Sequence, residues 1–388
     1  MYDWDLKPDS VPSGMGKNLL LMFCSVLIGV ALIEVGLRAL DPFRFRSGWR
    51  SNAEVNFQPL EHWRKNQLGF HGAPIAYTAE DKVVLLVGDS QVECQTCPDG
   101  HMPEDYLREA YQKLGKRTQV FTLGAGGYGA DQELLAVREY FDRGYRADLI
   151  LLWQTLGNDM WNAIFPQHSV TVGTGHLKPT FRLVDGSLEE PSSKIGGMYC
   201  RVYLWCVVQQ VALGGIERRF VNRLPPAVEP VALSAYSKLP VFESAEDVAD
   251  EKTHWSIWLK PNSPRKLYGY RLMNLLNKDL EALAAAHHAR FDVFDINRYT
   301  PEGLAEIEQF DFFKPGSKLV KAKGKYYLAA GEEGYWETSH AVNAGVPTIY
   351  VPVTIPNHSN SRADPHLNAR GNEHVLTKLA ADTVGQLQ

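Results

Sequence analysis

A serine that follows an apolar segment is the residue of this 388-residue sequence best placed to act in a reaction. Residues 82–87 (KVVLLV) have the composition of a strand that is buried on both faces of a parallel sheet. Gly88, Asp89 and Ser90 then predict a turn. Open α/β sheets bind their ligands at the carboxyl ends of the strands, so Ser90 lies where an active site is expected. The alternative is a loop serine that takes no part in chemistry.

The chain around Ser90 is predicted to alternate strands with helices. The other strand candidates cover residues 118–123, 148–153, 291–296 and 348–353. The helix candidates cover residues 103–114, 131–141, 265–288 and 369–386, the second of them with Asp131 as its N-cap. This alternation implies right-handed crossovers and a parallel sheet, which predicts an α/β fold.

Four of the predicted strands are followed by residues that suit acyl transfer. That chemistry needs a nucleophile, a base, a group that orients the base, and donors for the oxyanion. The Ser90 hydroxyl is the candidate nucleophile, and the His366 imidazole, whose pKa lies near neutrality, is the candidate base. Asp364 would hold the imidazole in the required tautomer. The candidate oxyanion donors are the backbone N–H groups of Ser90 and Gly127 and the side-chain amide of Asn158.

The sequence resembles the SGNH (GDSL-type) hydrolase superfamily in four blocks, which are here Gly88-Asp89-Ser90, Gly127, Gly157-Asn158-Asp159 and the Asp364/His366 pair. The resemblance covers about residues 82–160 and about 265 to the C-terminus, and residues 34–38, 66–70 and 127–132 resemble a membrane-anchored bacterial branch. It implies a flavodoxin-like three-layer α/β/α fold with an esterase or acyl-transfer activity. By this resemblance Ser90 is the nucleophile, Gly127 and Asn158 are oxyanion donors, and His366 is the base.

The acid of the catalytic set departs from the pattern of the superfamily. The usual acid lies three residues before the histidine, where this chain has Ala363. Asp364, two residues before His366, is the nearest carboxylate. A dyad in which a backbone carbonyl orients His366 is the alternative to a triad with Asp364.

The N-terminal part of the chain differs from the rest. Residues 19–33 carry no charge, and the apolar segment continues past Glu34 to Leu37, long enough to span a bilayer. We predict a tail and single-span transmembrane anchor in 1–40, a linker packed on the domain in 41–80, and an SGNH hydrolase-like domain in 81–388 with insertions at about 161–262 and 298–344. The alternatives for the apolar segment are a signal peptide, for which no clear cleavage site follows, and a buried core helix.

The side of the membrane is predicted from opposing signals. Basic residues are more numerous after the span than before it, which favours a cytoplasmic domain. A short tail before a large domain is commonly exported, and together with the resemblance this leads us to expect the exoplasmic or periplasmic side. Cys94 and Cys97 have redox or zinc spacing but no second pair of ligands, so we expect a local disulfide or two buried thiols.

The sequence therefore predicts a membrane-anchored serine esterase or O-acyltransferase that acts through an acyl-Ser90 intermediate on O-acyl groups of a polysaccharide or glycoconjugate. A net charge of −5 argues against nucleic-acid binding, and we expect neither a cofactor nor a metal. Aromatic residues in the 298–344 insertion suit a lid, a sugar-stacking surface or simple loop packing. They motivate one alternative, a non-catalytic glycan-binding or assembly component. The apolar segment 202–213, a predicted helix, motivates another, a lipase or thioesterase at the membrane surface.

Overall fold

The computed structural model describes residues 15–40, 64–165, 178, 180–191, 204, 256–257, 259–260, 262–298, 300, 317–322, 325–330, 332–360, 364 and 366–387. The chain divides into two compact units. The first contains Met1–Arg46 and Tyr199–Ile216, and the second contains Ser47–Met198 and Glu217–Gln388.

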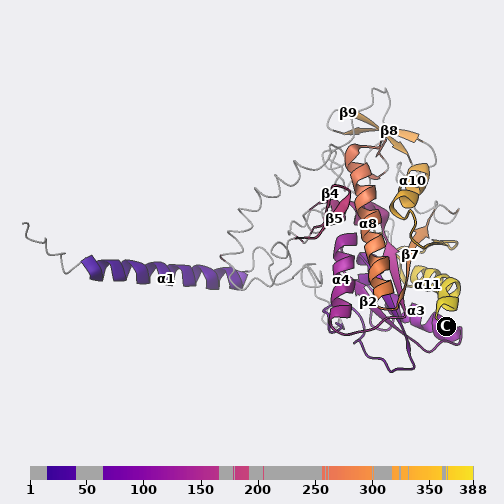
Figure 1. The fold of residues 1–388 in the computed structure, drawn as a ribbon, viewed down its shortest axis with the longest axis horizontal. Helices are drawn as coiled ribbons and strands as arrows, with labels where there is room; N and C mark the ends of the chain where they lie inside the picture. Colours follow the sequence, from indigo (N-terminus) through magenta and orange to yellow (C-terminus); the bar gives the residue numbers. More distant parts are fainter. Residues whose placement is uncertain are drawn as a thin grey trace, which may run out of the picture. The chain divides into compact units, whose positions relative to one another are not determined.

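The first unit contains the long helix α1 (Met15–Leu40), drawn in indigo in Figure 1. Its segment Lys17–Leu37 has 21 residues and a mean hydropathy of 2.5, and no part of it is buried. A helix of that length measures about 30 Å, the thickness of a bilayer core. The helix is therefore long and apolar enough to span a membrane, a test that a signal sequence also passes. Of the predicted helix 202–213, Leu204 alone lies within the described residues; it is helical, and its N–H donates to the Glu34 carboxylate at 2.8 Å.

The second unit contains a five-stranded, wholly parallel sheet. Its strands are β1 (Lys82–Gly88), β2 (Thr118–Gly124), β3 (Leu149–Gln154), β7 (Arg290–Asn297) and β10 (Thr348–Pro352). The spatial order β2-β1-β3-β7-β10 is the flavodoxin-like order 2-1-3-4-5. The predicted α/β fold is thereby confirmed, with each strand within two residues of its predicted bounds.

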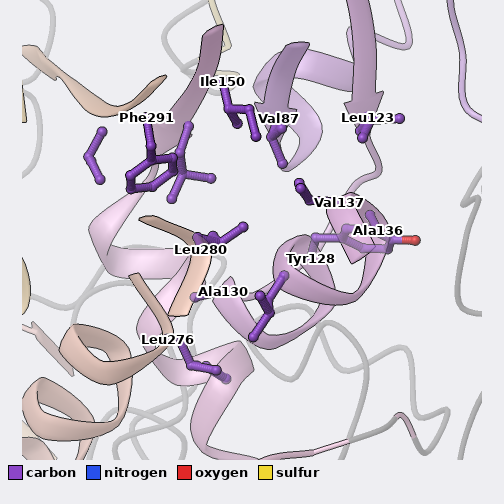
Figure 2. Packing of buried hydrophobic residues seen from close by; sticks show 14 of the residues in the cluster. Val87, Leu123, Tyr128, Ala130, Ala136, Val137, Ile150, Leu276, Leu280 and Phe291 are labelled. Carbon is purple, nitrogen blue, oxygen red and sulfur yellow. The ribbon is translucent and has the colours of Figure 1, made fainter. Parts of the chain in front are cut away.

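Helices cover both faces of this sheet. Successive side chains of a strand point to opposite faces, so a strand that is apolar along its whole length must be covered on both. Val84 and Leu86 pack in one hydrophobic cluster with α3 (Pro103–Lys113) and α11 (Ala369–Thr383). Val83, Leu85 and Val87 pack in the other cluster with α4 (Ala130–Asp142), α5 (Leu156–Ile164) and α8 (Pro264–Ala286). Figure 1 shows α4 and α8 lying side by side, and Figure 2 shows Val87 and Ile150 of the sheet facing Leu280 of α8 and Val137 of α4. The result is three layers.

The N-cap predicted for α4 is wrong. The cap is Gly129, and Asp131 lies inside the first turn, where its carboxylate pairs with Lys178. A Cβ on Gly129 would lie 2.6 Å from the backbone nitrogen of Ala163 in α5. Close packing of α4 against α5 therefore requires glycine at the cap. The side chain of Asp131 lies in the interior, where it pairs with the ammonium group of Lys178.

The two segments predicted as insertions contain secondary structure of their own. In 161–262, β4 (Arg182–Val184) and β5 (Ser187–Glu189) form a hairpin. In 298–344, β8 (Ser317–Ala322) and β9 (Lys325–Ala330) pair with each other, and β9 pairs with β6 (Leu259–Lys260). The helix α10 (Glu332–Val342) closes the second segment and leads into β10, so it is the crossover helix of the last parallel pair.

Within the second unit, residues that precede the first strand pack against the sheet and its helices. Leu68, Phe70 and Ile75, from the segment predicted as a linker, are buried in the same hydrophobic cluster as Val87. Asn66 donates to the carbonyl of Thr122 in the edge strand β2 at 2.9 Å, and Glu104 accepts from the N–H of Thr122 at 3.2 Å. These side chains satisfy backbone groups that an edge strand would otherwise leave exposed.

Candidate active site

Ser90 is the first residue of a four-residue helix, α2 (Ser90–Glu93), directly after the interior strand β1. The turn depends on Gly88, because a Cβ there would lie 2.7 Å from Val92 and 3.0 Å from the carbonyl of Trp153. Asp89 caps α2, and its Oδ1 accepts from the N–H of Gln91 at 2.9 Å. Ser90 is half-buried and directly follows a strand that is buried from Val83 to Gly88.

The structure brings His366 to Ser90 although 276 positions separate them in the chain. The Nε2 atom of His366 lies 2.7 Å from Ser90 Oγ, and its Nδ1 atom lies 2.5 Å from Oδ1 of Asp364. With the proton on Nδ1, Nε2 accepts the hydrogen bond from the serine hydroxyl. The hydroxyl, the imidazole and the carboxylate thus form one hydrogen-bonded series in the order that acyl transfer requires.

Further hydrogen bonds hold the loop that contains Asp364 and His366 in place and join it to α2, the helix that begins with Ser90. The N–H of Leu367 donates to Oε1 of Gln91 at 3.2 Å. The N–H of Asn360 donates to the carbonyl of His366 at 2.9 Å, and the Asn360 side chain donates to Oδ2 of Asp364 at 3.0 Å. Both carboxylate oxygens are therefore engaged, which leaves the carboxylate little freedom to turn.

The interaction between Asp364 and His366 favours the ionised form of the Asp364 carboxyl. Its hydrogen bond with His366 is the main cause that lowers the pKa of the Asp364 carboxyl to about 2. Burial opposes protonation of His366, but the hydrogen bond and charge of Asp364 outweigh it and raise the pKa of the imidazole above its usual 6.5. A base with a raised pKa accepts the serine proton more readily once it is neutral.

The two remaining candidate residues, Gly127 and Asn158, are joined through Asn162. Asn162 Nδ2 lies 3.0 Å from the carbonyl of Gly127 and 2.8 Å from Oδ1 of Asn158. Asn158 Nδ2 in turn donates to Oδ2 of Asp89 at 2.7 Å, the residue next to Ser90. Gly127 has a φ of +74°, a conformation that favours glycine. Hydrogen bonds therefore connect the two predicted oxyanion donors to the turn that carries the serine.

These candidate groups converge at the switch point of the sheet. Ser90 follows β1 and Asn158 follows β3, the neighbouring strands from which the chain winds in opposite directions. Ligands of doubly wound folds bind in the crevice at that point. The fold alone thus places the two residues where a substrate is expected.

Sequence reasoning missed several residues of this arrangement. Asn162 lies four positions after Asn158 on α5, a spacing that puts two side chains on one helix face and could have identified it. Gln91 and Asn360 gave no signal, because their roles depend on the loop with His366 reaching α2.

Cys94 and Cys97 form a disulfide, the first of the two arrangements expected for this pair. It closes a turn immediately after α2, and Cys94 adopts a left-handed conformation with φ of +41°. Within the described ranges, no three His, Cys, Asp or Glu side chains are grouped so that they could hold a metal ion.

Comparisons with known proteins give distant structural similarities only. No family model and no curated protein matches the sequence. Among solved structures, the chain is similar to TesA, with 11% identity, coverage of 79% of this chain and 100% of that chain, and a TM-score of 0.36. It is also similar to two variants of esterase AlinE4, with 14% and 15% identity. Each of these similarities covers 70% of this chain and 100% of that chain, with a TM-score of 0.23. At such TM-scores a similarity assigns no activity, so the functional case rests on the side chains.

Proposed function

We propose that this protein is a serine esterase that acts through an acyl-Ser90 intermediate, with His366 as general base and Asp364 as the residue that orients it. The observation that carries the proposal is the hydrogen-bonded series from Ser90 Oγ through His366 to Asp364. Ser90 and His366 are both half-buried, so a substrate from solvent reaches the hydroxyl.

In the proposed reaction His366 Nε2 takes the proton of Ser90 as Oγ attacks the carbonyl carbon of the ester. The carbonyl oxygen becomes an oxyanion, which accepts hydrogen bonds from the N–H groups of Ser90 and Gly127 and from Asn158. Asn158 Nδ2 donates to Asp89 at 2.7 Å and lies 3.5 Å from the carbonyl of Tyr128, and we propose that the oxyanion replaces the longer of these two contacts. Collapse of the tetrahedral intermediate breaks the bond to the alcohol oxygen, which leaves with the proton from His366. Water, or a hydroxyl of an acceptor, then attacks acyl-Ser90 with His366 again as base. The bond between the acyl carbon and Ser90 Oγ breaks, and Oγ takes the proton back from His366.

The proposed location is the exoplasmic or periplasmic face of a membrane, with α1 as the anchor. Two observations support it. The segment Lys17–Leu37 has the length and hydropathy of a single span. The second unit contains the Cys94–Cys97 disulfide, and disulfides persist mainly in oxidising compartments.

The proposed substrate is an O-acylated polysaccharide or glycoconjugate, as the resemblance of the sequence implies. A partly exposed aromatic group on α10 and β10 supports a carbohydrate partner. In it the Trp336 ring centroid lies 5.0 Å from that of Tyr350 and 5.9 Å from that of His340. Partly exposed rings of this kind are surfaces on which sugar rings stack.

Ester hydrolysis by the full-length protein in detergent tests the proposal. The substrates are model esters of short and long acyl chains and an O-acetylated polysaccharide. Ser90→Ala and His366→Ala are expected to lose at least about 10³-fold in kcat. Ser187→Ala, which changes an exposed serine of β5, is the control and keeps full activity. A fluorophosphonate is expected to label the wild type and the control but not Ser90→Ala.

Three results would change the assignment. Hydrolysis that survives both Ser90→Ala and His366→Ala contradicts it. Saturable polysaccharide binding without fluorophosphonate labelling favours the non-catalytic alternative. A strong preference for long acyl chains favours a lipase or thioesterase.

A further inference from the structure

Glu93 is a buried carboxylate at the end of the helix that carries Ser90, and the proposed reaction does not use it. Its exposed fraction is 1%. Its Oε2 atom accepts the N–H of Gly126 at 2.8 Å and the side-chain amide of Gln95 at 3.1 Å. Its backbone carbonyl contacts Nδ1 of His71 at 2.7 Å. Within the described part of the chain, no basic side chain pairs with this carboxylate.

The contact with Gly126 joins two parts of the candidate site. Glu93 lies three positions after Ser90 on α2, and Gly126 immediately precedes Gly127 in the loop after β2. The end of β2, from which this loop starts, lies close to α2: a Cβ on Gly124 would lie 2.8 Å from the backbone nitrogen of Glu93. The hydrogen bond between Glu93 and Gly126 therefore connects the helix of Ser90 with the residue that precedes Gly127.

We infer that Glu93 is a positioning residue that holds the Gly127 N–H at the oxyanion through its hydrogen bond to Gly126, an inference that rests on the proposed serine esterase activity. A neutral acceptor would satisfy Gly126 without the desolvation cost of a buried carboxylate. The carboxylate binds the N–H more strongly when it is ionised, because charge-assisted hydrogen bonds are shorter and stronger. The position of the loop thus depends on the protonation state of Glu93.

The surroundings of Glu93 raise the pKa of its carboxyl so that it changes protonation near neutral pH. Burial is the main cause that raises the pKa of its carboxyl to about 7, and the hydrogen bonds from Gln95 and Gly126 oppose the rise. The titratable groups that face it are Asp89, which raises its pKa, His366, which lowers it, and His71 at its carbonyl. Two ionisations, of His366 and of Glu93, are therefore expected to control activity between weakly acidic and neutral pH.

The test compares Glu93→Ala, Glu93→Gln and Glu104→Gln in full-length protein with a short-chain model ester from pH 5.5 to 9. Glu104 is the matched control: it is also fully buried with a pKa raised to about 7 by burial, but its carboxylate holds Ala73 and Thr122. Glu93→Ala is expected to lower kcat by about 10- to 100-fold with KM changed by less than about threefold, since the oxyanion donor is misplaced. Glu93→Gln offers Gly126 a neutral acceptor, as protonated Glu93 would, and is expected to lower kcat at pH 8 by a smaller factor than Glu93→Ala.

The pH profile distinguishes positioning from a general packing role. Wild type and Glu104→Gln are expected to show two ionisations in the acid limb of log(kcat/KM), and Glu93→Gln only one. If Glu93→Ala does not fold, the pH profile of Glu93→Gln alone tests the positioning role of Glu93. An unchanged number of ionisations in Glu93→Gln, or a Glu93→Ala kcat within threefold of wild type while Ser90→Ala is inactive, overturns the inference but leaves the esterase proposal intact. A fully active Ser90→Ala overturns both.

Discussion

The Asp364 carboxylate contacts His366 twice through the same oxygen. Oδ1 lies 2.5 Å from the ring Nδ1 and 3.1 Å from the backbone nitrogen of His366. A spacing of two residues therefore suffices for an acid to hold both the ring and the backbone of its histidine. The group at Nδ1 is this carboxylate, whereas the dyad alternative places a backbone carbonyl there.

Replacement of Asp364 tests the role proposed for this contact. Asp364→Ala is expected to lower kcat by roughly 10²- to 10⁴-fold with little change in KM, because the imidazole loses the group that fixes its tautomer and stabilises the imidazolium. Steady-state kinetics on a model ester measure the effect. The control is Asp382→Ala, on the exposed face of α11, which keeps wild-type activity. A loss below about threefold in Asp364→Ala favours the dyad.

The pH dependence of kcat/KM follows from the raised pKa of His366. The base must be neutral, so activity is expected to fall as the pH decreases through a pKa above 6.5. Asp364→Asn removes the charge that raises this pKa and is expected to move the acid limb to lower pH. Rates between pH 5 and 9 measure both profiles. A limb that moves to higher pH in Asp364→Asn contradicts the assignment of the base.

Two glycine substitutions test whether the backbone conformation at Gly127 matters for activity beyond its effect on stability. Gly127→Ala and Gly144→Ala both place alanine at a positive φ, of +74° and +81°, so each is expected to lose about 1–2 kcal/mol of unfolding free energy. Gly144 has open space around its Cβ position and lies two residues after the last residue of α4. Gly127→Ala is expected to lower kcat by at least about tenfold, and Gly144→Ala to leave it unchanged. Equal kcat values in the two variants show that activity does not depend on the glycine conformation at position 127.

Removal of one partner from the buried ion pair of Asp131 and Lys178 is expected to lower the stability of the protein strongly. Both side chains have no exposed surface. Lys178→Met leaves the Asp131 carboxylate buried without its cation, which is expected to cost about 3–5 kcal/mol of unfolding free energy. Denaturant or thermal unfolding measures it. The double variant Asp131→Leu/Lys178→Met removes both charges and is expected to recover a large part of the loss; a double variant less stable than Lys178→Met refutes this account.

The buried carboxyl groups of Glu133 and Asp159 predict that the protein is more stable at acidic than at alkaline pH. Burial is the main cause that raises the pKa of each well above its usual value. The folded state therefore keeps protons that the unfolded chain releases above about pH 4.5, so the unfolding free energy decreases as the pH rises from about 5 to 8.

Glu133→Gln removes one of these ionisations. It is expected to raise the melting temperature at pH 8 more than at pH 5. Glu109→Gln, on the exposed face of α3, is the control and is expected to show no such difference. An equal shift in melting temperature at both pH values is inconsistent with a protonated Glu133 in the folded state.

Local patterns predicted most of the fold. The β-branched and leucine-rich strands were located within two residues, because a strand buried on both faces must be apolar along its whole length. The N-cap of α4 was wrong because the choice between Gly129 and Asp131 depends on α5 and on Lys178, which the local sequence does not contain. Glu93 was missed for the same reason, because its contact with Gly126 joins residues 33 positions apart, whereas Asn162 carried a local signal in its spacing of four from Asn158.

By itself the sequence determined which chemical groups are present and at which ends of which strands they stand, since strand periodicity and turn residues are properties of neighbouring positions. The tertiary structure decided that the imidazole of His366 meets Ser90 on one side and Asp364 on the other. That arrangement depends on how the loop after β10 packs against α2, across 276 positions of chain, and no local preference encodes a contact of that range.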